Sequence, residues 1–210
     1  RVQRFKEGFT VLPALSMLGE LYEEDSEQAW LLAEKCGWLM AVELLTASID
    51  LSFAPVLDLN LGISSIIGNR SFHSNPEVVS LLADAFIGGM HAAGMHSVGK
   101  HFPGHGSVLV DSHISLPIDP RPLNEIIAQD LVPYFKLTRI LDAVMTAHIT
   151  FNEVDNNPAT FSSFWLQQIL RNQIGFTGVI FSDDLSMGAA HGIGECPQRA
   201  SQALAAGCDM

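Results

Sequence analysis

Short apolar segments alternate with longer segments of helical periodicity along most of this chain, and this alternation constrains its fold most strongly. The predicted strands lie at 51–61, 96–101, 142–150 and 178–182. The predicted helices lie at 26–48, 76–93, 123–139, 163–173 and 197–206. Parallel neighbours need a long crossover connection, usually a helix, whereas antiparallel neighbours can be joined by a tight turn. Strands that alternate with helices are therefore expected to run parallel. The sequence therefore predicts a parallel α/β sheet, with a further strand beginning at 207–210.

Polar residues follow the predicted strands one after another, which favours a barrel over a doubly wound sheet. In a (β/α)8 barrel the functional residues collect where the strands end, at the carboxyl face. A complete barrel takes about 250 residues and eight strands, whereas this chain has 210 residues, begins with Arg1 and ends at Met210. We therefore expect residues 1–210 to be a single (β/α)8 TIM-type barrel domain, truncated at both ends and incomplete.

The composition excludes several classes of protein. With 48% hydrophobic residues the chain can bury a core, and its formal charge of −12 opposes binding to nucleic acid or to an anionic membrane. No apolar run approaches the roughly 18 residues of a membrane span. Cys36, Cys196 and Cys208 lack the spacing of a disulfide framework or a zinc knuckle, so we expect buried small side chains. The sequence predicts a soluble protein.

The segment KHFPGHG at 100–106, followed by Asp111 and His113, concentrates the polar chemistry of the chain. Pro103 and the two glycines prevent a regular helix, so the segment is expected to be a loop. Asp111 and His113 share a side if the chain is extended, which allows the carboxylate to orient the imidazole as an acid/base group. The alternative is that Asp111 caps a turn and His113 is a surface histidine.

Zinc binding is a second interpretation of this loop. Imidazoles and a carboxylate suit zinc, and the four candidate ligands are His101, His105, Asp111 and His113. The break at Pro103 separates the histidines that a helix would place on one face, so we expect no metal and no other cofactor.

Other candidate residues lie where strands end or loops begin. Lys100 and His101 end a predicted strand, where they can hydrogen-bond sugar hydroxyls; a structural ion pair or a core histidine is the alternative. His148 ends the next strand, with the same two interpretations. Arg70 and Arg4 lie in polar segments and can bind a carboxylate or hydroxyls, unless they form only surface salt bridges.

Asp183 and Asp184 follow the last complete predicted strand. A carboxylate at the carboxyl end of a barrel strand is suited to act as a nucleophile. Either aspartate can instead cap the helix expected to begin near Leu185, which is the commoner role.

In these motifs the chain resembles the catalytic domain of the β-N-acetylhexosaminidases of glycoside hydrolase family 3. The motifs occur in order from RVQRF through SFAPVLD, GNRSFH, KHFPGHG, DSH and FSDDLSM to AGCDM. The resemblance implies Asp183 as nucleophile, with His113 as acid/base and Asp111 as its partner. It implies four residues in substrate binding: Lys100, His101, Arg70 and Arg4.

The resemblance further implies a cytoplasmic, metal-free enzyme of bacterial cell-wall recycling. Its substrate is a small glycan or muropeptide, its configuration is retained through a covalent glycosyl-enzyme, and a monomer is expected. One alternative is a phosphorylase, because a histidine acid/base would not repel incoming phosphate as a carboxylate does. The other is a noncatalytic sugar-binding fragment, since an upstream sugar-binding aspartate of the family lies outside this chain.

Overall fold

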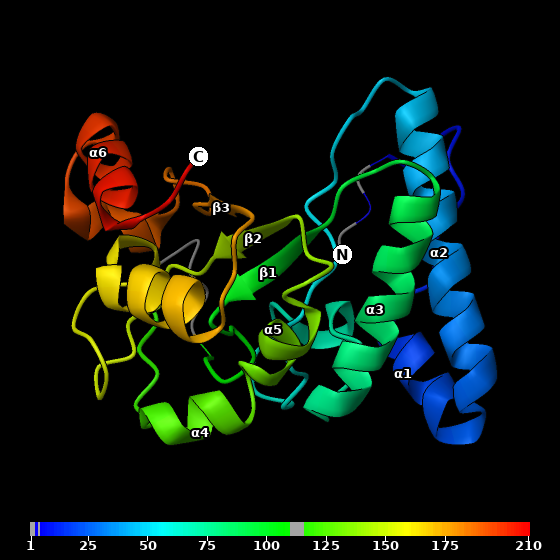
Figure 1. Cartoon of the computed structure of the whole chain (residues 1–210), viewed down its shortest axis with the longest axis horizontal. Coiled ribbons are helices and arrows are strands. Elements are labelled where there is room, and N and C mark those ends of the chain that lie inside the picture. The colour runs from blue at the N-terminus through cyan, green and yellow to red at the C-terminus, as the bar shows by residue number, and fades with distance from the viewer. Residues whose placement is uncertain (1–2, 4, 110–115) are drawn as a thin grey trace.

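The computed structural model describes residues 3, 5–109 and 116–210. Its sheet has three parallel strands in the order β1 (Val98–Phe102), β2 (Ala143–Thr146) and β3 (Val179–Phe181). Each lies within or next to a predicted strand, and all pairs are parallel. The predicted parallel α/β sheet is therefore confirmed (Figure 1).

The predicted strand at 51–61 is not a continuous strand. Pro55 has no N–H to contribute to a ladder, and Val56 alone forms an isolated parallel bridge, with Lys100. The segment nevertheless lies along β1, because the Val98 amide donates to the Ala54 carbonyl at 2.7 Å. A buried, extended segment thus takes the place next to β1 in which the sequence predicts a strand.

The chain end lies along the opposite edge of the sheet. The Asp209 amide donates to the Ile180 carbonyl at 2.8 Å, and the Ser182 amide donates to the Met210 carbonyl at 2.8 Å. Across the described residues the neighbours therefore follow chain order: 54–57, β1, β2, β3 and 209–210. A doubly wound sheet would contain a reversal of this order at its switch point.

Three predicted helices are confirmed with small changes at their ends. They are α2 (Ser26–Thr46), α3 (Pro76–Ala92) and α6 (Cys196–Ala206). Side-chain caps fix where the first two begin, since Asp25 accepts from the Gln28 amide at 3.0 Å and Asn75 from the Glu77 amide at 2.9 Å. The structure adds a helix that we did not predict, α1 (Leu15–Glu24).

The predicted helix at 123–139 is wrong as a single element. It is divided into α4 (Leu123–Ala128) and α5 (Val132–Leu137), with Pro133 in the first turn of α5. Proline cannot donate the hydrogen bond that would continue α4, but it suits a helix start.

Several connections form other helical turns. The predicted helix at 163–173 is a π-helix, η3 (Phe164–Gln173), and there are 3-10 turns at η1 (Gly68–Arg70), η2 (Ala159–Phe161) and η4 (Gly188–Ile193). In place of the helix that was expected to begin near Leu185, the structure has η4, which begins at Gly188.

The two faces of the sheet have different surroundings. Helices α2 and α3 lie side by side, α5 packs on α3, and α6 lies near β3 and the chain end (Figure 1). Phe102 packs edge-on against Tyr134 and Trp165, with centroids 5.2 and 6.2 Å apart. The other face bears a separate small cluster of Val98, Ala143 and Met145, against which Leu51 and Phe181 pack.

Cys36 and Cys208 are buried as predicted, but Cys196 is exposed because it is the first residue of α6. Burial raises the pKa of the Cys208 thiol to about 12. Within the described part of the chain, no helix has both the length and the apolar character needed to cross a membrane.

Candidate active site

A buried carboxylate, Asp58, organises the turn that follows β1. Its side chain is fully buried and contacts His101 Nδ1 at 2.6 Å. It also accepts from two backbone amides, that of His101 at 3.2 Å and that of His105 at 2.7 Å. Burial raises the pKa of the Asp58 carboxyl, but the charge and hydrogen bonds of His101 outweigh this effect and hold the pKa below its ordinary value.

The ionised Asp58 fixes the tautomer of His101. A carboxylate can only accept, so His101 Nδ1 carries the proton and donates it to Asp58. In the neutral ring Nε2 is then an acceptor, suited to a hydroxyl of a ligand. The expected core role and the expected binding role of His101 are therefore compatible, because they use different ring nitrogens.

His105 connects this group to Asp183. Its ring packs edge-on against that of His101, with centroids 5.7 Å apart. Burial and the charge of His101 lower the pKa of His105, whereas the carboxylates of Asp58 and Asp183 act in the opposite direction. Asp183 therefore lies within electrostatic reach of the turn after β1, although the two segments are far apart in sequence.

The two aspartates after β3 have different local roles. Asp184 Oδ1 accepts from the amide and the hydroxyl of Ser186, at 2.8 and 2.7 Å, and so closes a local turn. The expected helix cap is wrong, because η4 begins only at Gly188 and no side chain caps it. Asp183 Oδ1 accepts from the Asp184 amide at 2.8 Å, and the Asp183 side chain is partly accessible. Asp184 thus holds the turn after β3, and Asp183 remains the candidate nucleophile.

His148 supports this turn from the end of β2. Its Nε2 contacts the Asp184 carbonyl at 3.1 Å and its Nδ1 contacts the Thr160 hydroxyl at 2.9 Å. Burial lowers the pKa of His148, and a carbonyl can only accept. The neutral ring therefore donates through Nε2, and its Nδ1 contacts the Thr160 hydroxyl, which also lies 3.1 Å from the Ala147 carbonyl. The described structure gives His148 the structural role that was one of its two interpretations.

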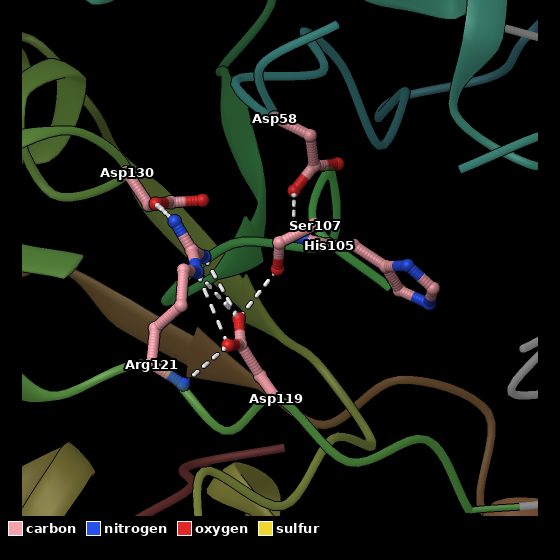
Figure 2. Close-up of polar contacts among 6 residues, drawn as sticks. All are labelled: Asp58, His105, Ser107, Asp119, Arg121 and Asp130. Atoms are coloured by element: carbon pink, nitrogen blue, oxygen red, sulfur yellow. Dashed lines mark hydrogen bonds and ion pairs between the residues drawn. The ribbon is translucent and has the colours of Figure 1, made fainter. Parts of the chain in front are cut away.

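A second polar group lies beside the Asp58 turn, and we call Ser107, Asp119, Arg121 and Asp130 the Arg121 cluster (Figure 2). Arg121 Nη2 donates to Asp119 at 2.7 Å and Nη1 donates to Asp130 at 2.8 Å. The Ser107 hydroxyl donates to Asp119 at 2.5 Å. Figure 2 shows the His105 ring pointing away from this cluster.

The two carboxylates that share Arg121 differ in pKa. Burial raises the pKa of the Asp119 carboxyl, but hydrogen bonds from Arg121 and Ser107 hold it below its ordinary value. Burial raises the pKa of Asp130, and its single bond to Arg121 does not offset this. The difference follows from partner number, because Asp130 Oδ1 is buried without a hydrogen-bond partner in the described structure.

The remaining predicted residues are placed as follows. Lys100 pairs with Met145 in the β1–β2 ladder, and its side chain is partly buried. Arg70 ends η1, where its Nη1 donates to the Ile66 carbonyl at 3.1 Å; no ion pair of Arg70 occurs among the described residues. Three other predicted residues, Arg4, Asp111 and His113, lie outside the described residues.

Sequence reasoning did not select Asp58 or the Arg121 cluster as site residues. A signal for Asp58 was present, because it is a charged residue at the end of an apolar run. Arg121 had no comparable signal. Its partners Asp119 and Asp130 lie on either side of it in sequence without a recognisable pattern.

Candidate acid, base and hydrogen-bonding groups thus collect at the carboxyl edge of a parallel sheet, the arrangement of an α/β enzyme domain. Comparison with known proteins defines the family. The chain belongs to glycosyl hydrolase family 3: the family's N terminal domain matches residues 1–210.

Curated relatives are named beta-hexosaminidases. The one from Alkalilimnicola ehrlichii is 53% identical over 211 residues, which cover 100% of this chain and 61% of the relative. The one from Tolumonas auensis is 56% identical over 212 residues, with 100% and 62% covered. The chain therefore spans about three fifths of the length of these relatives.

Solved structures share the fold. NagZ from Neisseria gonorrhoeae in complex with N-trifluoroacetyl-D-glucosamine is 52% identical, with a TM-score of 0.94 over 99% of this chain and 61% of that one. A family 3 β-N-acetylglucosaminidase from Paenibacillus is 36% identical, with a TM-score of 0.92 over 100% of this chain and 39% of that one.

The zinc interpretation is not tested by the described residues. Among them, no group of three or more His, Cys, Asp or Glu side chains has the arrangement to hold a metal ion. Two of the four candidate ligands, Asp111 and His113, lie outside that set. NagZ from N. gonorrhoeae has also been solved in complex with zinc ion; it is 50% identical, with a TM-score of 0.92 over 99% of this chain and 60% of that one.

Proposed function

We propose that the full-length protein is a retaining β-N-acetylhexosaminidase. Its substrates are peptidoglycan fragments (anhydromuropeptides) with terminal β-linked N-acetylglucosamine, which it hydrolyses in the cytoplasm during cell-wall recycling. Family membership, the names of the curated relatives and the sugar analogue bound to the N. gonorrhoeae protein support this function.

We further propose that residues 1–210 form part of one (β/α)8 barrel domain. The order of neighbours in the sheet supports a barrel, since each successive strand is added on the same side without a reversal. The small apolar cluster of Val98, Ala143 and Met145 would then face the barrel axis.

Asp183 is the proposed nucleophile, and the observation that carries the proposal is its position. It directly follows β3, its charge reaches His105 and His148, and the neighbouring Asp184 holds the turn. A partly accessible carboxylate in this setting can approach the anomeric carbon of a sugar bound at the carboxyl edge of the sheet.

His113, oriented by Asp111, is the proposed acid/base. In the first step an Asp183 oxygen bonds to the anomeric carbon as the glycosidic bond breaks, and the His113 proton passes to the departing oxygen. In the second step a water gives its proton to His113 while its oxygen bonds to the anomeric carbon, and the bond to Asp183 breaks. Two inversions retain the configuration.

The proposed substrate-binding residues are Lys100, His101, Arg70 and Arg4. For His101 the geometry supports a specific contact, because Asp58 occupies Nδ1 and directs Nε2 to a sugar hydroxyl. Arg70 supports the same interpretation, since within the described residues its guanidinium donates to the Ile66 carbonyl and forms no ion pair with a carboxylate.

The test is turnover of an aryl β-N-acetylglucosaminide by the full-length protein. Asp183→Ala is expected to reduce turnover to the background rate, whereas Asp84→Ala, which removes an exposed carboxylate on α3, is expected to leave it unchanged. Near-normal turnover by Asp183→Ala would contradict the assignment. Products formed with and without phosphate separate the phosphorylase, because sugar 1-phosphate as the main product would exclude a hydrolase.

A further inference from the structure

The Arg121 cluster joins the two ends of the segment 108–118. Ser107 immediately precedes this segment and Asp119 immediately follows it, and their side chains are hydrogen-bonded at 2.5 Å. The segment contains Asp111 and His113 in sequence. The chain therefore enters and leaves the proposed acid/base segment at two points in direct contact.

Both points are fixed to other parts of the fold. On the entry side, the His105 amide donates to Asp58, and a Cβ on Gly104 would lie 2.5 Å from Asp130 Oδ1. On the exit side, the Asp119 amide donates to the Thr150 carbonyl at 2.9 Å. The entry is thus held against the segment before β1 and the exit against the segment after β2.

Arg121 connects these points through a buried ionic group. Asp119 and Asp130 have side chains that are 1% exposed, and that of Arg121 is 18% exposed. Arg121 Nε contacts both oxygens of Asp119 at 3.1 Å while Nη1 binds Asp130 between α4 and α5. A guanidinium fork that is shared in this way fixes direction as well as distance.

We propose that the Arg121 cluster is a positioning group for proton transfer. It fixes where the chain enters and leaves 108–118, the segment whose sequence contains Asp111 and His113, and proton transfer by His113 depends on these two fixed points. The inference rests on the proposed function, in which His113 is the acid/base. Arg121 is a positioning residue in this proposal, because it acts through Asp119 and Asp130.

This role has a chemical signature that a loss of general stability does not have. A poor leaving group needs the proton of His113, whereas a dinitrophenolate departs without one. General acid catalysis contributes about 10²–10⁴-fold in rate. Azide also needs no base: its nitrogen bonds to the anomeric carbon as the bond to Asp183 breaks, which gives a β-glycosyl azide and the free carboxylate.

The experiment compares Arg121→Gln with wild type in the full-length protein, on an alkyl and on a dinitrophenyl β-N-acetylglucosaminide. We expect kcat/KM for the alkyl glycoside to fall by about 100-fold or more and kcat/KM for the dinitrophenyl glycoside by less than about 10-fold. Azide is expected to raise turnover of the dinitrophenyl glycoside and to give the β-azide product. Arg121→Lys, which keeps the charge without the fork, should lie between the two.

Arg171→Gln is the matched control. Arg171 is also partly buried and donates to the Phe176 and Gly178 carbonyls and to Asp209, at 3.1, 2.6 and 2.8 Å. It does not contact the Arg121 cluster. Its loss is expected to lower stability and to affect both substrates equally, without a response to azide.

An equal loss on both substrates by folded Arg121→Gln, or no azide product, would overturn the inference. If Arg121→Gln does not fold, Ser107→Ala replaces it, because that change removes one hydrogen bond and leaves both ion pairs. It should shift the ratio of the two kcat/KM values in the same direction, and an unchanged ratio would overturn the inference. Failure of the proposed function is distinct, since wild type would then cleave neither glycoside.

Discussion

Replacing Asp58 with Asn tests whether the buried carboxylate holds the turn after β1. The carboxylate accepts from His101 Nδ1 at 2.6 Å and from the amides of His101 and His105. An asparagine keeps one oxygen acceptor but turns an amino group toward donors. Either one buried donor is then left without a partner, or the His101 proton must move from Nδ1 to Nε2.

The structure allows the cost to be bounded. A hydrogen bond to a charged group contributes about 1.5–3 kcal/mol, and an unpaired buried donor costs about 1–3 kcal/mol. We therefore expect Asp58→Asn to reduce the free energy of unfolding by about 3 kcal/mol. At an m value of about 2 kcal/mol/M, the urea midpoint falls by about 1.5 M.

The loss is also expected to depend on pH. Burial raises the pKa of Asp58, but His101 outweighs it, so the folded pKa lies below the unfolded value. A carboxylate of this kind stabilises the fold fully above its unfolded pKa of about 3.9, and its contribution is lost as the pH falls through the lower, folded value. The difference between variant and wild type should therefore persist at neutral pH and shrink below about pH 4.

The assay is urea unfolding of the full-length protein followed by circular dichroism, at pH 7 and at several values below pH 5. Asp84→Asn is the control, because Asp84 is exposed on α3 and its removal is expected to change stability by less than about 0.5 kcal/mol. An Asp58→Asn midpoint within error of wild type at pH 7 would refute the reasoning. A difference that grows on acidification would refute the sign of the pKa argument.

Three further changes are measured by the same unfolding assay. Thr160→Val leaves His148 Nδ1 unpaired and should lower the free energy of unfolding by about 1–3 kcal/mol. Thr160→Ser keeps the hydroxyl and should not lower it by this amount. Gly106→Ala places a Cβ 2.0 Å from a backbone carbonyl and should lower the free energy of unfolding by about 1–3 kcal/mol. Gly88→Ala, in open space on α3, should raise it by about 0.5–1 kcal/mol. Burial raises the pKa of Asp142, but hydrogen bonds outweigh it and lower the pKa to about 2. We expect Asp142→Asn to differ from wild type by under about 1 kcal/mol in the free energy of unfolding at neutral pH. The two free energies should converge as the pH falls from about 4 toward 2.

The sequence by itself determined where most secondary structure lies, because periodicity and capping are local properties. Asp25 and Asn75 mark the starts of α2 and α3, and the strands β2 and β3 lie in apolar runs. The exceptions are also local in origin. Pro55 interrupts the expected strand at 51–61 and Pro133 divides the expected helix at 123–139.

The sequence also determined which residues are suited to chemistry, but not their partners. His148 was open between two roles until the Asp184 carbonyl and Thr160 were seen to occupy both ring nitrogens. The residue pattern did not distinguish the two aspartates after β3; the resemblance implied Asp183 as nucleophile, and the structure adds that Asp184 binds Ser186.

Only the tertiary structure decided that Asp58 binds His101 and that Arg121 joins Ser107, through Asp119, to Asp130. Asp58 and His101 lie on neighbouring extended segments separated by α3, and hydrophobic periodicity does not specify which segments become neighbours. Pairing is decided when strands and helices pack and buried charges must find partners to offset their loss of hydration.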